Sequence, residues 1–399
     1  MREHGHTIRY SLINFSLYIL AVNGFGFASF YLVNNGFDNF GSGLVIAGAQ
    51  VAAVILMPLV GRLADRKNRF SIPVILGILA GFALISAAML LLKVESRPVL
   101  TGMFFAFITV SCYLMIPQVN ALCMFYVNRG VSIDFGIARG IGSLAYALGS
   151  MVVGYFSADD RLGPKFVPMA VMAASIMILV AMLIFRRLAG QIASDPVENA
   201  VETPEKASGV LTAFLKKYHR FVILLGGITL IFVSHNVLTN YTYQLCVSIG
   251  GGATESGIAN GIAAAAELPV MFLFSLLLKR FKPENMIKVS CLFFCLKALV
   301  AGIALTLGSV ALLYGAMVLQ MFGYGLFIPA SVYYTNTAVG ESDLTTGQSA
   351  MVMTNTLGGV LGSLLGGFLL DSLPTVMTVW IVLGLSIVGA LLSIGVIGE

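Results

Sequence analysis

Three ionisable side chains, Arg139, His235 and Glu267, stand within long apolar stretches of the sequence. A carboxyl or imidazole group can exchange a proton, and a guanidinium group can hold a small molecule with several donors. Glu267 follows four alanines and lies two residues before Pro269, which removes a backbone donor beside the carboxyl group. Ionisable groups in apolar surroundings usually mark a binding site or a proton path. The structural alternatives are a buried ion pair and, for Arg139, a side chain that reaches the membrane surface.

A set of uncharged polar residues follows His235. Four of them recur at steps of four, three and one residues and would share one face of a helix: Asn236, Asn240, Tyr243 and Gln244. Amide and phenol groups suit a neutral, hydroxyl-rich ligand better than an anion. Amide side chains in other apolar stretches are expected to add to the same lining: Asn23, Gln118, Asn120 and Gln320.

The composition identifies a membrane protein. Of the 399 residues, 58% are hydrophobic and 10% are charged, whereas soluble proteins carry about 25% charge. A helix needs about 20 apolar residues to cross a bilayer. Twelve spans are expected, at 10–34, 43–60, 71–93, 98–126, 136–157, 166–185, 220–248, 256–278, 286–307, 309–338, 346–370 and 374–397. The predicted fold class is an all-α membrane protein with two six-helix, pseudo-symmetric halves.

A long polar segment divides the chain. We expect an N-terminal half at 1–186, a linker exposed to the cytoplasm at 187–219 and a C-terminal half at 220–399. A shift of 214 residues lays Gly43 on Gly257 and Arg66 on Arg280, which indicates a weak internal duplication. Transporters built from such repeats hold their solute between the halves, near the middle of the membrane.

Basic residues are distributed unevenly between the loops. With the N-terminus in the cytoplasm, 17 of the 23 Lys and Arg residues fall in cytoplasmic segments and 4 in outer loops. Basic loops stay in the cytoplasm. The sequence therefore predicts a multi-pass protein of the bacterial plasma membrane with both termini in the cytoplasm.

The connector between the second and third spans packs five charges into the nine residues Gly61-Arg62-Leu63-Ala64-Asp65-Arg66-Lys67-Asn68-Arg69. Its spacing resembles the loop between helices 2 and 3 of the major facilitator superfamily. Gly61, Asp65, Arg66 and Arg69 match the family pattern, and Asn68 replaces a glycine. In the family this loop latches the outward-open state, so the resemblance implies that these residues act as a conformational switch.

Two further segments resemble the oligosaccharide:proton symporters and the related nucleoside symporters. Phe135, Gly136 and Arg139 match the Phe-Gly-x-x-Arg pattern of the fifth helix. The resemblance implies that Arg139 binds the solute and that Tyr146 stacks on it. It also places Glu267 where the family has a carboxylate that accepts hydrogen bonds from sugar hydroxyls.

The tenth span departs from that pattern. The five residues from Leu319 resemble the Leu-His-Met-Phe-Glu of the family, but Gln320 replaces the histidine and Gly323 replaces the proton-carrying glutamate. Burial would favour the protonated form of Glu267, which suits a proton carrier, while a neighbouring arginine would favour the ionised form. Either Glu267 carries the proton, with help from His235, or the protein is an uncoupled facilitator.

Glycines recur at four-residue spacing in the fifth span (Gly136 and Gly140) and in the eleventh (Gly358 and Gly362). This spacing lets helix backbones approach closely. The glycines serve either static packing or faces that slide as the halves rock.

The sequence thus predicts a secondary transporter that works by alternating access. It would take up a sugar, glycoside or nucleoside together with protons. A drug or metabolite exporter with the same fold is the alternative. The partners expected are the solute, protons and the bilayer, for a monomer without cofactor, metal or nucleic acid. No phosphate-binding loop, HExxH motif or nucleophile elbow points to an enzyme. The expected solute-binding residues are Arg139, Tyr146, Asn236, Asn240, Tyr243, Glu267, Gln320 and Asn120, with Glu267 and His235 for proton coupling.

Overall fold

The computed structural model describes residues 2–65, 72–92, 97–127, 131, 133–189, 217–340 and 343–397. Within these ranges the chain folds into helices and short turns, without strands. Among the described residues, eleven helical segments are long and apolar enough to cross a membrane. The twelfth predicted span is the first one along the chain, and it is interrupted by an irregular turn. The all-α, twelve-span prediction is confirmed.

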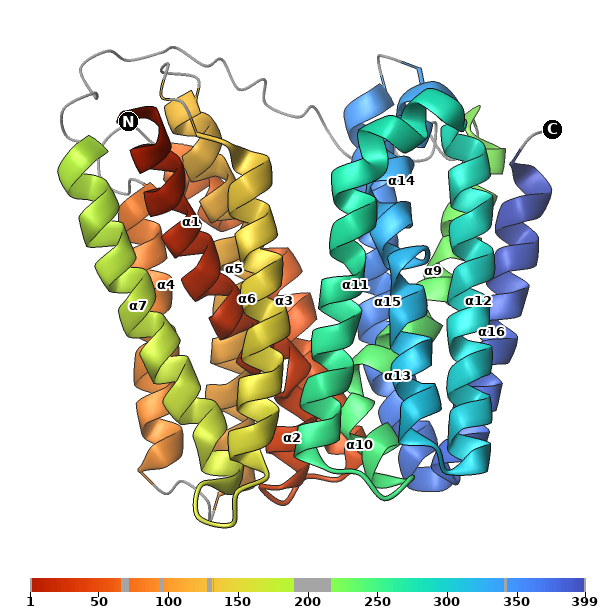
Figure 1. The fold of residues 1–399 in the computed structure, drawn as a ribbon, viewed down its shortest axis with the longest axis horizontal. Helices are drawn as coiled ribbons and strands as arrows, with labels where there is room; N and C mark the ends of the chain where they lie inside the picture. Colours follow the sequence, from red (N-terminus) through yellow and green to blue (C-terminus); the bar gives the residue numbers. More distant parts are fainter. Residues whose placement is uncertain are drawn as a thin grey trace.

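Two bundles stand side by side, and both chain ends lie at the same end of the molecule (Figure 1). The N-terminal bundle contains α1 (Arg2–Ala21), η1 (Val22–Gly26), α2 (Ala28–Val33), α3 (Asn39–Asp65), α4 (Ile72–Leu91), α5 (Pro98–Val127), α6 (Phe135–Ser157), η2 (Gly163–Lys165) and α7 (Phe166–Ala189). The C-terminal bundle contains α9 (His219–Asn240), α10 (Thr242–Val247), α11 (Ala253–Arg280), α12 (Pro283–Leu307), α13 (Val310–Val318), η3 (Leu319–Met321), α14 (Tyr324–Ala338), α15 (Leu344–Ser372) and α16 (Thr375–Val396).

The helices are apolar on their outer faces as well as in the bundle cores. Each bundle has its own apolar core, with side chains such as Tyr10 and Phe105 in the first and Phe232 and Phe327 in the second. Large apolar side chains also remain exposed on outward faces, for example Leu391 at 69%. Such surfaces match the hydrocarbon of a bilayer.

Three predicted spans are interrupted near their middle or at one end. The first contains the π-helical turn Val22–Gly26, where two glycines weaken the α-helix. The seventh breaks at Tyr241, whose backbone (φ −111°, ψ 23°) separates α9 from α10. The tenth passes through the 3-10 turn Leu319–Met321 just before Gly323. At each break the helix changes its geometry, so the side chains on either side of the break no longer share one face.

Helix pairs from different bundles form the interface between the halves, namely α6 with α11 and α3 with α15. At Gly154 of α6, an added Cβ would lie 2.6 Å from the Ala253 carbonyl oxygen and 2.8 Å from the Gly257 Cα of α11. The two backbones therefore touch because neither residue has a side chain. Gly140 also faces the other half, since its Cβ would lie 3.0 Å from the Phe272 ring. Gly358 and Gly362 instead face α9 of their own half, so they serve packing within the bundle.

Hydrogen bonds between the halves gather at the end of the molecule opposite the chain termini, which we call the closed end. Asn39, the first residue of α3, is the centre of this set. Its backbone N–H and its side-chain amide donate to Asp371 Oδ1 of α15 (3.1 and 2.8 Å). Its side-chain oxygen accepts from Gln244 (3.1 Å), and its carbonyl accepts from the Tyr241 hydroxyl (3.4 Å). Phe40 N–H adds a bond to Asp371 Oδ2 (2.7 Å).

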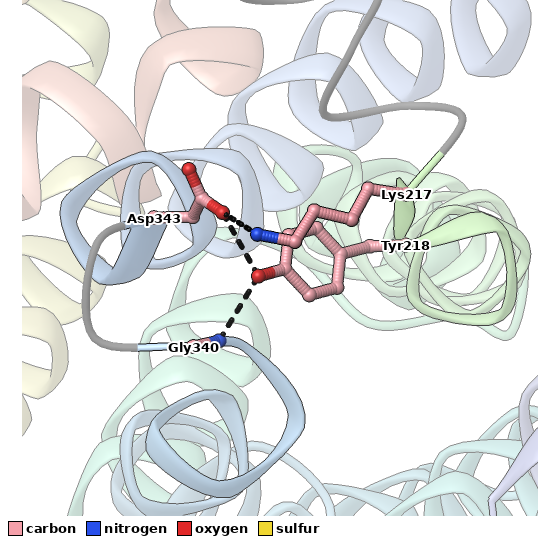
Figure 2. A network of polar contacts seen from close by, with 4 residues as sticks. All are labelled: Lys217, Tyr218, Gly340 and Asp343. Carbon is pink, nitrogen blue, oxygen red and sulfur yellow. Dashed lines mark hydrogen bonds and ion pairs between the residues drawn. The ribbon is translucent and has the colours of Figure 1, made fainter.

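Figure 2 shows a second polar network, formed by Lys217, Tyr218, Gly340 and Asp343. Lys217 pairs with Asp343 (2.7 Å), and the Tyr218 hydroxyl donates to the same carboxylate (2.9 Å) and accepts from Gly340 N–H (3.1 Å). The hydrogen bond to Asp343 raises the pKa of Lys217 above its ordinary value. The network fastens the residues before α9 to the turn between α14 and α15.

The structure describes only the first part of the predicted switch loop. Gly61 belongs to α3 and Asp65 ends that helix, whereas Arg66 and Arg69 lie outside the described residues, as does the core of the predicted linker, 190–216. The division at 187–219 therefore stays a prediction.

Candidate functional site

A chain of three polar side chains crosses the middle of the C-terminal bundle. Lys297 of α12 donates a hydrogen bond to Gln320 Oε1 of η3. Gln320 Nε2 donates to Glu267 Oε1 of α11 at 2.7 Å. Lys297 is 2% exposed and Gln320 is 7% exposed. A buried cation, an amide and a carboxylate are thus linked in a row.

The local backbone explains why Gln320 and Glu267 meet. The 3-10 turn at 319–321 places Gln320 beside α11. Gly325 of α14 then packs directly against α11, because a Cβ at that position would lie 3.3 Å from Glu267 Cα. A larger residue at 325 would push α14 away from the carboxylate.

Arg139 of α6 approaches the same region from the other bundle. Its NH1 group donates to Ser143 Oγ at 2.9 Å, one helical turn later. Its guanidinium carbon lies 4.5 Å from the centre of the Tyr18 ring of α1, a favourable cation–π position. The half-buried Arg139 is therefore held by contacts within its own bundle, on the helix that packs against α11, the helix of Glu267.

Tyr146 is half-buried on α6, two helical turns beyond Arg139. An added Cβ on Gly26 of η1 would lie 2.8 Å from the Tyr146 hydroxyl, so the missing side chain leaves room for this ring. The Asn260 amide of α11 donates to the Gly26 carbonyl at 3.3 Å. The irregular turn in the first span thus positions the ring beside the interface.

His235 and Asn236 lie on α9 near Tyr324 of α14. The His235 ring stacks on the Tyr324 ring with centroids 5.2 Å apart and 12° between planes, and its Nδ1 atom is buried without a described hydrogen-bond partner. Asn355 of α15 donates to the Tyr324 hydroxyl at 3.5 Å and accepts from Asn236 at 3.4 Å. Asn236 also donates to the Phe232 carbonyl (2.8 Å).

The remaining expected site residues lie elsewhere. Because the seventh span breaks at Tyr241, the expected single polar face is divided. Asn240 donates to Ser363 Oγ (2.9 Å), Tyr243 packs edge-on against Phe30, and Gln244 bonds to Ser29 and Asn39 at the closed end. Asn120 is half-buried on α5.

Four residues near the site were not among those expected from the sequence: Tyr18, Ser143, Tyr324 and Asn355. They are common uncharged residues, and only the contacts across helices distinguish them. Lys297 is a weak candidate from the sequence alone, because it is an ionisable residue that lies well inside an apolar span.

These side chains can both donate hydrogen bonds to an uncharged molecule and accept hydrogen bonds from it. Arg139 supplies donors, and Glu267 supplies an acceptor from the opposite half. Tyr146 and Tyr324 offer aromatic faces and hydroxyl groups. Among the described residues no group of three or more His, Cys, Asp or Glu side chains is placed to hold a metal ion.

Two helical bundles with polar side chains at their interface define a membrane transporter rather than an enzyme. The chain belongs to the MFS_1 like family, whose model matches residues 8–382. This membership confirms the resemblance to the major facilitator superfamily.

Solved structures share the same fold. A variant of the nucleoside transporter NupG is 16% identical, with a TM-score of 0.82 over 98% of this chain and 99% of that one. NupG itself is 17% identical, with a TM-score of 0.79 over 99% of both chains. PepTSo2, tetrameric in its crystal, is 11% identical, with a TM-score of 0.72 over 100% of this chain and 97% of that one. No curated protein sequence matches the chain.

Proposed function

We propose that the protein takes up a small polar solute, a sugar, glycoside or nucleoside, by alternating access coupled to protons. The observation that carries this proposal is the position of Glu267. Its carboxylate lies midway along α11, is bonded on one side to Gln320, and belongs to the helix that packs against α6, the helix of Arg139. A group at that place can contact a solute and respond to the movement of the halves.

The side chains around Glu267 support a neutral, hydroxyl-rich solute. Most of the polar groups there are uncharged amides and phenols, which exchange hydrogen bonds with hydroxyl groups. Gln320 bonds to Glu267, and Tyr324, Asn355 and Asn236 are joined to one another by hydrogen bonds. The likeness to NupG, a nucleoside transporter, agrees with a nucleoside as one member of this class.

We place both termini in the cytoplasm of a bacterial cell, in the plasma membrane, on the basis of the basic loops. The closed end, where hydrogen bonds join the halves, then faces outward. The linker would lie on the cytoplasmic side, and the protein would act as a monomer.

An uncoupled facilitator is the second candidate, and Gln320 and Gly323 favour it. They stand where the related symporters have a histidine and a glutamate. Coupling would then depend on Glu267, with help from His235. An exporter of drugs or metabolites is the third candidate, favoured by the many Phe and Met residues of the chain.

Uptake by purified protein in liposomes separates these candidates. Labelled uridine, adenosine, lactose and melibiose are offered with and without an inward proton gradient. A coupled symporter accumulates one of them only with the gradient. Equilibration that ignores the gradient would identify a facilitator. If none of the solutes enters, the sugar and nucleoside proposal is wrong and the exporter becomes the first candidate.

A further inference from the structure

Lys297 is a fully buried cation that the proposed function does not use. It lies in the middle of α12, and its ammonium group donates to Gln320 Oε1. His235 and Glu267 are within its electrostatic range, from α9 and α11. Burying an ammonium group in this apolar interior costs free energy. Its hydrogen bond to Gln320 therefore suggests a specific role for the charge.

The chemistry of the two side chains fixes the direction of the Gln320 amide. An ammonium group has three donors and no acceptor, and an ionised carboxylate has acceptors only. Gln320 lies between them and can turn its oxygen toward only one of the two. With Oε1 toward Lys297 and Nε2 toward Glu267, both contacts are hydrogen bonds. The reversed amide would set N–H against the ammonium group and C=O against the carboxylate, and it would lose both.

The fixed amide leaves one oxygen of Glu267 available. Gln320 bonds to Oε1, and no described residue donates a hydrogen bond to Oε2. A solute hydroxyl can therefore donate to Oε2 without displacing Gln320. If the amide turned freely, its carbonyl could oppose the carboxylate and the pair would lose its fixed geometry.

We propose that Lys297 is a positioning residue, which orients the Gln320 amide so that Glu267 keeps one oxygen free for a solute hydroxyl. The effect on the solute rests on the proposed function, whereas the orientation of the amide does not. Lys297 itself does not touch the solute. It acts through Gln320 because a donor-only group is required at that position.

Substitutions at 297 separate charge and donor character from simple bulk. Lys297→Met removes the donor and keeps an unbranched apolar side chain. Lys297→Gln keeps polarity but can also accept, so it permits both amide orientations. Lys297→Arg retains a donor-only cation. Lys288→Met makes the same change on the same helix, nearer the end that carries the termini, and is the matched control.

The orientation can be read without any solute. Protein in liposomes is labelled with 15N at the Gln side-chain amides and 13C at the Glu carboxyls, and the dipolar coupling between the two is measured by solid-state NMR. The coupling of Gln320 to Glu267 is assigned by its loss in Glu267→Gln. We expect it to persist in wild type, Lys297→Arg and Lys288→Met, and to weaken in Lys297→Met and Lys297→Gln. An unchanged coupling in folded Lys297→Met and Lys297→Gln would overturn the proposal.

Transport then tests the consequence for the solute that wild type takes up. We expect Lys297→Met to raise KM about tenfold to a hundredfold, the effect of losing one charge-assisted hydrogen bond, with Lys297→Arg largely restoring it. A normal KM in Lys297→Met, despite a weakened NMR coupling, would refute the role in solute binding. If wild type takes up none of the four solutes, the proposed function fails, and the NMR result still decides whether Lys297 orients Gln320.

Discussion

Asp371 caps the N-terminus of α3 from the opposite half of the molecule. Its carboxylate accepts hydrogen bonds from the backbone and side-chain nitrogens of Asn39 and from the backbone of Phe40, at 2.7 to 3.1 Å. The first N–H groups of a helix lack partners within the helix and favour a negative charge. The contact therefore joins the halves at the closed end through a charge and a helix terminus.

We expect Asp371→Asn to weaken the closed end. Loss of the charge should cost about 0.5–2 kcal/mol, the range for the loss of a helix cap. Distances between spin labels at Asn34→Cys and Ser248→Cys report the opening. Asp38→Asn is the control, because Asp38 caps the same helix through Gly41 N–H (2.7 Å) from its own half. If both variants open the closed end equally, the contact between Asp371 and Asn39 stabilises that end no more than the cap from Asp38 does.

Gly257→Ala should prevent close approach of α6 and α11. An added Cβ would lie 2.8 Å from Gly154 Cα, which is backbone and cannot turn aside. Overpacking of this kind costs about 1–3 kcal/mol. The same spin labels should report a more open end, and the uptake rate should fall. Gly315→Ala, with no atom within 4 Å of the added Cβ, should change neither measurement.

The Lys217–Asp343 pair should depend on pH in a defined direction. The pKa of Lys217 is raised above the ordinary 10.5 by its hydrogen bond to Asp343. The contact is therefore fully present below pH 10.5 and is lost as the pH rises through the raised pKa. NMR titration of 13C-methylated lysines, with Lys217 assigned by Lys217→Arg, should show its midpoint fall in Asp343→Asn. An unchanged midpoint would contradict the contact.

Arg139→Lys should impair solute binding although the charge is kept. Lysine lacks the planar fork that bonds Ser143 and lies on the Tyr18 ring. We expect a loss of about 1.5–3 kcal/mol in binding, the range for hydrogen bonds to charged groups, seen as a raised KM with little change in Vmax. A fall in Vmax alone would indicate that Arg139 acts in the movement of the halves instead.

The sequence was sufficient for the spans because apolar length is a strong signal in a membrane protein. It did not reveal the break at Tyr241, which separates Gln244 from Asn236. A periodicity argument assumes an unbroken helix. At the break, the Tyr241 hydroxyl donates to the Ser363 carbonyl at 2.5 Å, a contact with a helix more than 100 residues away in the sequence. Contacts between bundles, such as Asp371 with Asn39, have no local signal at all.

Glu267 and Arg139 were found because charges are rare in apolar spans. The partners that hold them, Gln320 and Ser143, were harder to identify. The sequence singles out Gln320 as an amide in an apolar span and as the residue in place of the family's histidine, but not as the partner of Glu267, and Ser143 is one of many hydroxyl residues. Their roles depend on the turn at 319–321 and on the rotamer of Arg139, which the sequence does not specify.

The most direct test of the account is gradient-driven accumulation by Glu267→Gln. The variant keeps an oxygen that can accept from Gln320 but cannot exchange a proton. Glu255→Gln, in the first turn of α11, is the matched control, since the Glu255 carboxylate accepts a hydrogen bond from the Gly252 N–H (2.7 Å) outside the site. We predict that wild type and Glu255→Gln accumulate the solute against its gradient, while Glu267→Gln only equilibrates it. Undiminished accumulation by Glu267→Gln would contradict the assignment of Glu267 as the coupling residue.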